Sequence, residues 1–261
     1  MLTGIDHIVI AVPDLDAATR SYEALGFTVV PGGRHPVGTH NALIAFADGA
    51  YIELIAFYEK NTQHKWWEPL QRGGGLVDFC MQTDDLMADT RAFRAAGVDI
   101  DDPAPLSRVR PDGYKLEWVL SIPRGSHKGV APFLIQDGTP REERVPRQHR
   151  HANGVTGIGA VTVAVDDPAT VGGWYARALD RPGRDVRRDD LDGAGVAFRI
   201  GPHTLEFVAP RSPSGPLCDW LDVRGASPFA ATLRTSAAAG ALDAGRTVGA
   251  RLSLVREEAQ S

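Results

Sequence analysis

The sequence has only two cysteines, no long apolar run and no excess of positive charge. Cys80 and Cys218 lie far apart and lack metal-type spacing, so we expect two buried free thiols in a reducing compartment. No uninterrupted apolar run approaches the ~20 residues that a membrane helix requires, so no membrane partner is expected. The N-terminal residues lack the basic and apolar regions of a signal peptide, so we expect a cytoplasmic protein that starts at Met1.

The charge balance argues against a nucleic-acid partner. The formal net charge is −5 and the pI is about 5.9, so the basic footprint of a nucleic-acid-binding protein is missing. One arginine-rich stretch spans residues 141–150, but Glu142 and Glu143 interrupt it. We expect a solvated linker there rather than a phosphate-binding patch, with His149 and His151 exposed.

What the sequence does contain is an internal repeat. Its 261 residues, 43% apolar and 23% charged, are enough for one large domain or two ordinary ones. Period-2 alternation and turn residues predict a β-α-β-β-β order in the first 57 residues. The expected elements are strand 4–12, a helix from Asp14 to Gly26, strand 27–30, and a hairpin of 41–47 and 50–57 about Asp48-Gly49.

The same order recurs three more times. Placing Gly4 on Gly75 also aligns Gly26 with Gly97 without gaps. The second copy is expected to have strands 76–82, 98–100, 114–122 and 130–136, with a helix that contains Leu86 and Phe93 after the first strand. A third copy has strand 157–165, a helix after Asp166-Asp167-Pro168, and hairpin strands 196–200 and 204–209. A truncated fourth has strand 229–235, an alanine-rich helix 237–244 and strand 250–255.

We therefore expect an α+β fold of paired βαβββ modules that form curled mixed sheets around a cleft. The expected domains are residues 1–140, with the candidate site, and 154–261, joined by a linker near 138–153.

Alternation along the strands assigns their faces. In the first strand Ile8 and Ile10 take the side expected to pack on the module's own helix, and His7 takes the other. Glu53 faces the same space as His7 from the fourth strand. In the repeat Asp78 aligns with His7, with Val77, Phe79 and Met81 on the opposite, apolar side, so three ionisable side chains are expected to converge.

These segments resemble the glyoxalase-like branch of the vicinal oxygen chelate superfamily. The resemblance covers most of the chain and is carried by residues 6–12 (DHIVIAV), 38–43 (GTHNAL), 51–55 (YIELI), 132–136 (PFLIQ) and 151–154 (HANG). It implies paired βαβββ modules around a cleft that holds a divalent metal in catalytic members. Family ligands sit on the first and fourth strands of each module, positions that His7, Glu53, Asp78 and Phe133 occupy here. In the second half only Glu206 remains, while Ala160 and Ala230 stand at the other traceable positions, so no metal is expected there.

The candidate metal ligands are thus His7, Glu53 and Asp78, and the metal Mn²⁺, Fe²⁺, Ni²⁺ or Zn²⁺. Such a metal polarises vicinal oxygens of a substrate, and Glu53 is also the candidate catalytic base. The alternative is a hydrogen-bonded His–Glu–Asp network that lines a metal-free pocket.

The candidate substrate-binding residues are His40, Asn41, Gln82 and Trp118. Each has a simpler interpretation, an exposed or turn position for His40 and Asn41 and core packing for Trp118. Trp66 and Trp67 carry the same two interpretations as Trp118.

Two functions follow. One is a metal-dependent lyase, isomerase, epimerase or dioxygenase acting on a small oxygenated compound; the other is a metal-free protein that sequesters a small molecule. A homodimer is left open, and the substrate is not readable from the sequence. Glyoxalase I activity and extradiol dioxygenation are both disfavoured, because the second module's ligands and a second histidine are missing.

Overall fold

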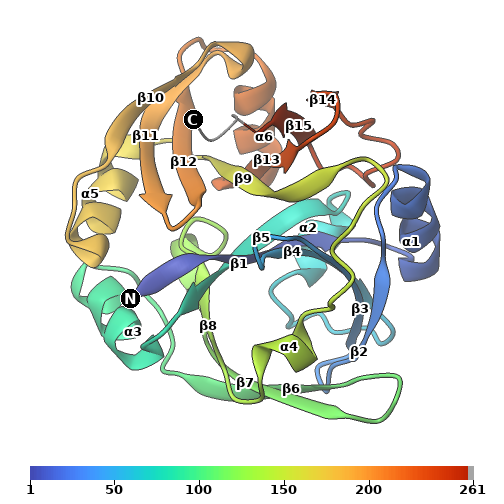
Figure 1. The fold of residues 1–261 in the computed structure, drawn as a ribbon. Helices are drawn as coiled ribbons and strands as arrows, with labels where there is room; N and C mark the ends of the chain where they lie inside the picture. Colours follow the sequence, from blue (N-terminus) through green and yellow to red (C-terminus); the bar gives the residue numbers. More distant parts are fainter. Residues whose placement is uncertain (258–261) are drawn as a thin grey trace.

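The computed structural model describes residues 1–257, and its first part is a closed eight-stranded barrel of order β1-β4-β3-β2-β6-β7-β8-β5 (Figure 1). The strands are β1 (Leu2–Ala11), β2 (Val30–Arg34), β3 (Thr39–Ala45), β4 (Tyr51–Phe57), β5 (Gly75–Thr83), β6 (Ala104–Val109), β7 (Lys115–Ser121) and β8 (Phe133–Asp137). Four helices accompany them, α1 (Leu15–Ala24), α2 (Trp67–Gln71), α3 (Leu86–Ala95) and α4 (Arg141–Arg144), with a 3-10 turn at Gly125–His127.

The second part is an open seven-stranded sheet of order β10-β11-β12-β9-β13-β15-β14. Its strands are β9 (Val155–Ala164), β10 (Arg184–Arg188), β11 (Gly193–Ile200), β12 (His203–Pro210), β13 (Ser227–Thr235), β14 (Gly240–Ala241) and β15 (Leu252–Arg256). It carries α5 (Pro168–Leu179) and α6 (Pro216–Arg224), with a 3-10 turn at Asp189–Leu191. The fold is therefore α+β with curled mixed sheets, as expected from the sequence.

The helix starts and stops follow the repeated local signals. The carboxylate of Asp14 accepts the Ala17 N–H at 2.8 Å, and Asp85 accepts the Ala88 N–H at 2.9 Å, so each caps its helix. Gly26 follows α1 and Gly97 follows α3 with φ values of 86° and 101°, a left-handed conformation that glycine adopts without a Cβ clash.

Several elements differ from the prediction. The second strand is Val30–Arg34 rather than 27–30, β6 was not expected, and around 98–100 only Ile100 forms an isolated bridge. The helix expected at 237–244 is wrong: a two-residue strand and turns stand there instead. Gly240 interrupts this alanine-rich segment at φ 156°, and so short a segment cannot recover the cost of helix nucleation. The unexpected α6 begins at Pro216, and proline suits a first helical position.

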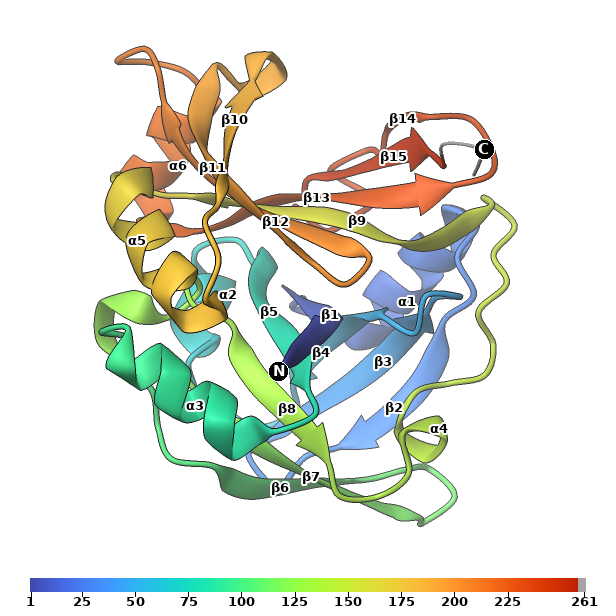
Figure 2. The same cartoon turned by 60° about the vertical axis from the view of Figure 1, so that its left-hand side comes forward.

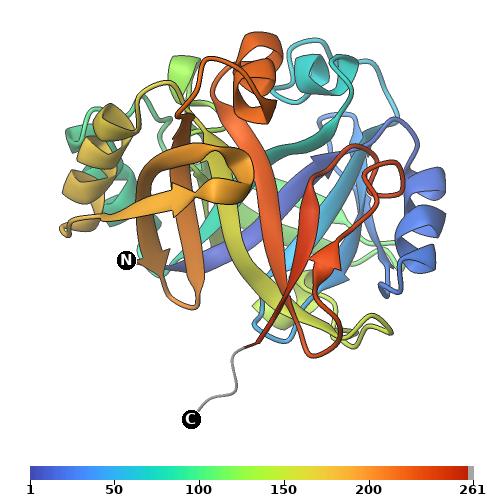
Figure 3. The same cartoon turned by 90° about the horizontal axis from the view of Figure 1, so that it is seen from above.

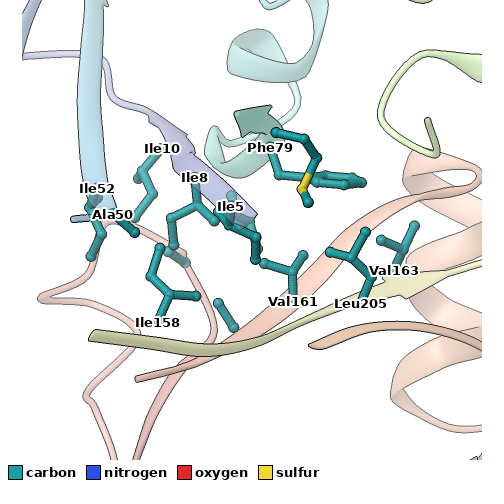
Figure 4. Packing of buried hydrophobic residues seen from close by; sticks show 14 of the residues in the cluster. Ile5, Ile8, Ile10, Ala50, Ile52, Phe79, Ile158, Val161, Val163 and Leu205 are labelled. Atoms are coloured by element: carbon teal, nitrogen blue, oxygen red, sulfur yellow. The ribbon is translucent and has the colours of Figure 1, made fainter. Parts of the chain in front are cut away.

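One hydrophobic core joins the barrel to the second sheet. Figure 4 shows Ile8 and Ile10 of β1 and Phe79 of β5 on the barrel side, with Val161 of β9 and Leu205 of β12 facing them. Figures 2 and 3 show β9, β12 and β13 crossing over β1 and β5. The apolar face of β1 thus packs on the second sheet, while α1 packs mainly on β3 and β4. Full burial of each such side chain contributes about 1.5–3 kcal/mol.

Since one core spans both sheets, the division into domains at 1–140 and 154–261 stays a prediction. The chain passes from the barrel to the sheet between Asp137 and Val155. Within residues 1–257, none of the helices has the length and apolar character that crossing a bilayer requires.

Candidate functional site

The barrel encloses a cavity of about 230 Å³. Most of its wall is apolar and aromatic and includes Ile55, Leu106, Trp118, Leu120, Phe133 and Ile135. Polar side chains line the same space, namely His7, His35, Asn41, Glu53 and Arg108. Trp66 and Trp118 line the cavity, but Trp67 packs edge-on against Phe57 at 5.1 Å. A concave, largely apolar space with a few polar groups is typical of a small-molecule site.

His7 is held in place by buried neighbours on all sides. Its Nδ1 lies 2.7 Å from a carboxylate oxygen of Asp6, which has no exposed surface. The ring stacks on Tyr51 at 4.6 Å between centroids and meets the edge of Phe133 at 5.3 Å. Burial alone raises the pKa of the Asp6 carboxyl, but Arg144, the hydrogen bond to His7 and Arg141 together hold that pKa well below its usual value.

These contacts fix the tautomer of His7. Because Asp6 is ionised, it only accepts hydrogen bonds, so Nδ1 of His7 donates. Its Nε2 then carries the ring's lone pair in the neutral form, and this atom lies 3.5 Å from Oε2 of Glu53. A lone pair and a carboxylate oxygen at this distance are complementary to a shared positive species, a proton or a metal ion.

Glu53 is oriented from its other side by Asn41. The Nδ2 of Asn41 donates to Oε1 of Glu53 at 2.5 Å, and both side chains are buried. The two residues come from adjacent strands, β3 and β4, where Asn41 pairs with Ile55 and Leu43 with Glu53. The structure thus brings three predicted residues, His7, Asn41 and Glu53, together at the cavity, and Trp118 lines the same space.

Asp78 is not part of this group, which corrects the predicted three-residue set. Its carboxylate lies 2.8 Å from Nζ of Lys65 and accepts the indole N–H of Trp66 at 2.8 Å, and it does not line the cavity. β1 and β5 are antiparallel, and their pairing places Cys80 opposite His7 and Asp78 opposite Val9, two residues away. A register shift follows directly after Asp78, where the next pair is Leu76 with Ile10.

The same shift turns Val77 into the barrel interior, although alternation placed it on the outer face. Phe79 and Met81 do face outward, as predicted.

Two predicted substrate-binding residues also lie elsewhere. His40 alternates with the cavity-lining Thr39 and Asn41, so its ring points to the other face of β3 and meets Tyr58 edge-on at 6.0 Å. Gln82 is only partly buried near the end of β5 and does not line the cavity. Neither position contacts the space where His7 and Glu53 meet.

The arginine-rich segment is not a solvated linker throughout, because Arg144 is 3% exposed. Its guanidinium donates to Asp6, to Asp137 and, at 2.8 Å, to the hydroxyl of Tyr51. His151 is likewise half-buried, with Nδ1 accepting the Thr28 N–H at 3.0 Å, whereas His149 is exposed as expected. The segment thus supplies the charge that balances Asp6 behind His7.

A pocket of about 420 Å³ beside β10–β12 is more open to solvent than the barrel cavity, and neither Glu206 nor a histidine lines it. Glu206 accepts from Arg188 at 2.6 Å and from the hydroxyl of Thr162 at 2.9 Å, so its carboxylate is already satisfied. Leu217 of α6 packs with Phe229 and Val208 of the sheet, and Ala230 borders this cluster. That the second half binds no metal stays a prediction.

A family model described as a glyoxalase-like domain matches residues 5–179 of this sequence, from β1 through α5. The chain belongs to the glyoxalase-like family. This family is part of the vicinal oxygen chelate superfamily, so the resemblance noted in the sequence is confirmed. A search among curated proteins gives no match.

Solved structures share the glyoxalase-like fold at low identity. A hypothetical protein from Staphylococcus aureus has a TM-score of 0.71 at 17% identity, over 97% of this chain and 98% of that one. A mutant 4-hydroxymandelate synthase from Streptomyces coelicolor has 0.63 at 15%, over 90% and 72%. A xylose isomerase-like TIM barrel/4-hydroxyphenylpyruvate dioxygenase fusion protein has 0.54 at 15%, over 90% and 36%. At such identities the likeness is one of fold.

Relatives in the superfamily use divalent metals, and two groups of side chains in this glyoxalase-like site offer ligand atoms for one. Within residues 1–257 one set of three potential ligands lies together, Asp6, His7 and Cys80. Asp6 already accepts from His7 and two arginines, and burial raises the pKa of the Cys80 thiol well above its usual value, so this set does not suit a cation.

His7 Nε2 and Glu53 Oε2 suit a cation better. Their 3.5 Å separation is close to the edge of a tetrahedron with metal–ligand bonds of about 2.1 Å. Asp6 stands behind His7 as carboxylates do behind metal-bound histidines. Two protein ligands are one fewer than most catalytic zinc sites have, so substrate oxygens and water would supply the remaining positions.

Sequence reasoning did not predict several cationic or imidazole groups that line the cavity, among them Arg108, His35 and His64. Arg108 is 3% exposed, and burial lowers the pKa of His35 to about 4 and, together with Lys65, that of His64 to about 4. Both histidines are therefore neutral near pH 7. No local motif marks these residues; the one available signal is alternation in the strand around Arg108, which places it on the face of Leu106.

Proposed function

We propose that this glyoxalase-like protein is a divalent-metal-dependent enzyme acting on a small, oxygen-bearing and largely apolar compound inside the barrel. The observation that carries the proposal is the pair His7 Nε2 and Glu53 Oε2, 3.5 Å apart at the cavity wall, each held by a buried partner. Two of the similar folds carry the names of a synthase and a dioxygenase, which accords with an enzyme on this scaffold.

The metal, when bound by His7 and Glu53, would polarise neighbouring oxygens of the substrate and stabilise the negative charge that develops there. The chain's own residues do the rest. Asp6 keeps the lone pair of His7 directed at the site, and Asn41 keeps Glu53 fixed. The carboxylate of Glu53 takes or returns a proton at the substrate, while Trp118 and Phe133 exclude water and strengthen both interactions.

This donor set favours a lyase, isomerase or epimerase over a dioxygenase. Oxygen-activating non-haem iron sites commonly use two histidines and one carboxylate, whereas this cavity offers one histidine and one carboxylate in ligand range of each other. Proton transfer next to a polarised oxygen needs only the pair that is present.

The test is metal binding by the purified protein and its variants. We expect Mn²⁺ or Zn²⁺ to bind the natural protein, with His7→Ala and Glu53→Gln each lowering the affinity about 100-fold, since each removes one of two ligands. His149→Ala and Glu117→Gln, both exposed, are the matched controls and keep the affinity. Equal metal binding by the natural protein and both site variants would refute the assignment.

A second measurement addresses the open coordination positions. Acetohydroxamate, which presents two adjacent oxygens, is expected to raise the melting temperature only in the presence of the metal.

A metal-free small-molecule binding protein is the second candidate, favoured by the presence of only two protein ligands at an apolar cavity. It predicts equal stabilisation by apolar ligands with and without a chelator. Loss of all ligand binding on chelation would exclude it.

A further inference from the structure

Within the part of the chain that the structure describes, one cation of the cavity has no anionic partner. Arg108, on β6, is 3% exposed. Its NH1 donates to Oδ1 of Asn41 at 3.2 Å and its NH2 to the carbonyl oxygen of Arg144 at 3.1 Å. Its Nε has no hydrogen-bond partner among residues 1–257, and no carboxylate oxygen of those residues lies within 4.0 Å of the guanidinium. A buried charge with two neutral acceptors is incompletely compensated.

The other cations around the cavity differ from Arg108 in this respect. Lys65 lies 2.8 Å from Asp78, Arg144 pairs with Asp6 and Asp137, and Arg124 pairs with Asp101. Each therefore has a carboxylate of the chain itself. The Nζ of Lys65 also lacks a well-aligned hydrogen bond, but it has the charge of Asp78 beside it. Within residues 1–257 Arg108 therefore differs from these three cations in having no carboxylate within 4.0 Å.

The surroundings of Arg108 indicate the body of the ligand. Leu106, Trp118 and Leu120 of β6 and β7 line the same cavity, and His35, neutral near pH 7, adds no second positive charge. A strongly hydrated dianion such as phosphate would need more donors than this wall offers. A single carboxylate on an apolar or aromatic body matches one guanidinium within an apolar enclosure.

We propose that Arg108 anchors the carboxylate of a small apolar or aromatic acid, so that the substrate class of this cavity is a monocarboxylate. The anchor adjoins the chemical centre, because Asn41 contacts Arg108 with its oxygen and Glu53 with its nitrogen. An acid held at Arg108 therefore presents the atoms near its carboxylate to His7 and Glu53. This inference rests on the proposed function in placing the substrate in the barrel, but its test needs no metal.

The test compares benzoate with its neutral isostere benzamide, by calorimetry on the full-length protein in the presence of a chelator. We expect benzoate to bind at least about tenfold more tightly than benzamide. Arg108→Gln is expected to abolish this preference, because it removes the charge and keeps an amide donor. Arg110→Gln is the matched control: Arg110 lies two residues along the chain, is paired with Asp112 and Glu143 and does not line the cavity, so the preference remains.

The melting temperature distinguishes a ligand anchor from a purely structural role of Arg108. If Arg108 mainly stabilised the fold, its replacement would lower the melting temperature. Removing an uncompensated buried charge is expected to leave the melting temperature of ligand-free Arg108→Gln equal to or above that of the natural protein. If this variant fails to fold, the claim that Arg108 is an uncompensated charge in the ligand-free protein is overturned. The comparison of benzoate with benzamide on the natural protein then still decides whether the site selects an anion.

Equal affinity for the two probes, an undiminished preference in Arg108→Gln, or tighter binding of inorganic phosphate than of benzoate would each overturn the proposal. These outcomes are separate from failure of the metal assignment. A protein that prefers benzoate but binds no metal would keep the carboxylate anchor and lose the proposed metal-dependent chemistry.

Discussion

Replacing Arg144 by methionine tests the network behind the site most directly. All five N–H groups of Arg144 are used: they donate to both oxygens of Asp6, both oxygens of Asp137 and the hydroxyl of Tyr51. Methionine fills much of the volume but donates nothing, so it leaves Asp6 buried with Arg141 as its remaining arginine.

The expected magnitude follows from the burial of both partners. Arg144 is 3% exposed and Asp6 is 0% exposed, and loss of one partner from a buried ion pair typically costs about 3–5 kcal/mol. For a chain of this size that corresponds to a fall in melting temperature of roughly 10 °C. Since Asp6 also holds Nδ1 of His7, we expect the metal affinity to fall about 10–100-fold.

The assay is urea unfolding followed by circular dichroism, at pH 7 and at several values below pH 4. In the natural protein the pKa of Asp6 is depressed, so its stabilisation is present above its unfolded pKa of about 3.9 and is lost as the pH falls through the lower folded value. Arg144→Met is expected to weaken this acid-side loss. The exposed Arg147, replaced in the same way, is the control. A variant within 1 kcal/mol of the natural protein at pH 7, with an unchanged acid profile, would refute the reasoning.

Two further predictions concern other buried polar groups. Burial lowers the pKa of His35 to about 4, so between about pH 6.5 and 4 the unfolded chain binds a proton there that the folded protein does not. The free energy of unfolding should therefore fall by roughly 2 kcal/mol from pH 7 to pH 5. In urea unfolding, His35→Asn should remove that part of the pH dependence. If the slope is the same in the variant, His35 is not its source. Asp48 accepts from Arg234 at 2.6 Å and contacts His203 at 3.2 Å, joining the barrel to the second sheet. Asp48→Ala should cost about 2–4 kcal/mol, and the exposed Asp222→Ala almost nothing; similar midpoints for both would contradict this role.

Much of the first 60 residues could be predicted from local pattern. Alternation placed Ile8 and Ile10 on the packed face and His7 on the inner one, and the aspartate and glycine signals placed α1 and α3. These signals act over a few residues, so the sequence contains them directly. The pairing of His7 with Glu53 followed from the same alternation, because both strands keep an undisturbed register with each other.

The repeat aligned Asp78 with His7, but the two side chains do not meet. The antiparallel pairing of β1 with β5 places Cys80 opposite His7 and Asp78 opposite Val9, where its carboxylate contacts Lys65. Which residues of two strands lie opposite each other is decided by how the strands pair, so it is not visible in the sequence of either strand.

The sequence by itself determined the repeated βαβββ order, the capped helices and the two side chains at the centre of the candidate site, because each depends on residues close together in the chain. Only the tertiary structure decided that Arg144, 138 residues after Asp6, supplies positive charge to the network behind His7. Only the tertiary structure decided, too, that Arg108 enters the cavity with no carboxylate of residues 1–257 beside its guanidinium. Both depend on closure of the barrel and on the path of the chain beyond it, and electrostatic compensation between distant residues leaves no periodic signal in a sequence.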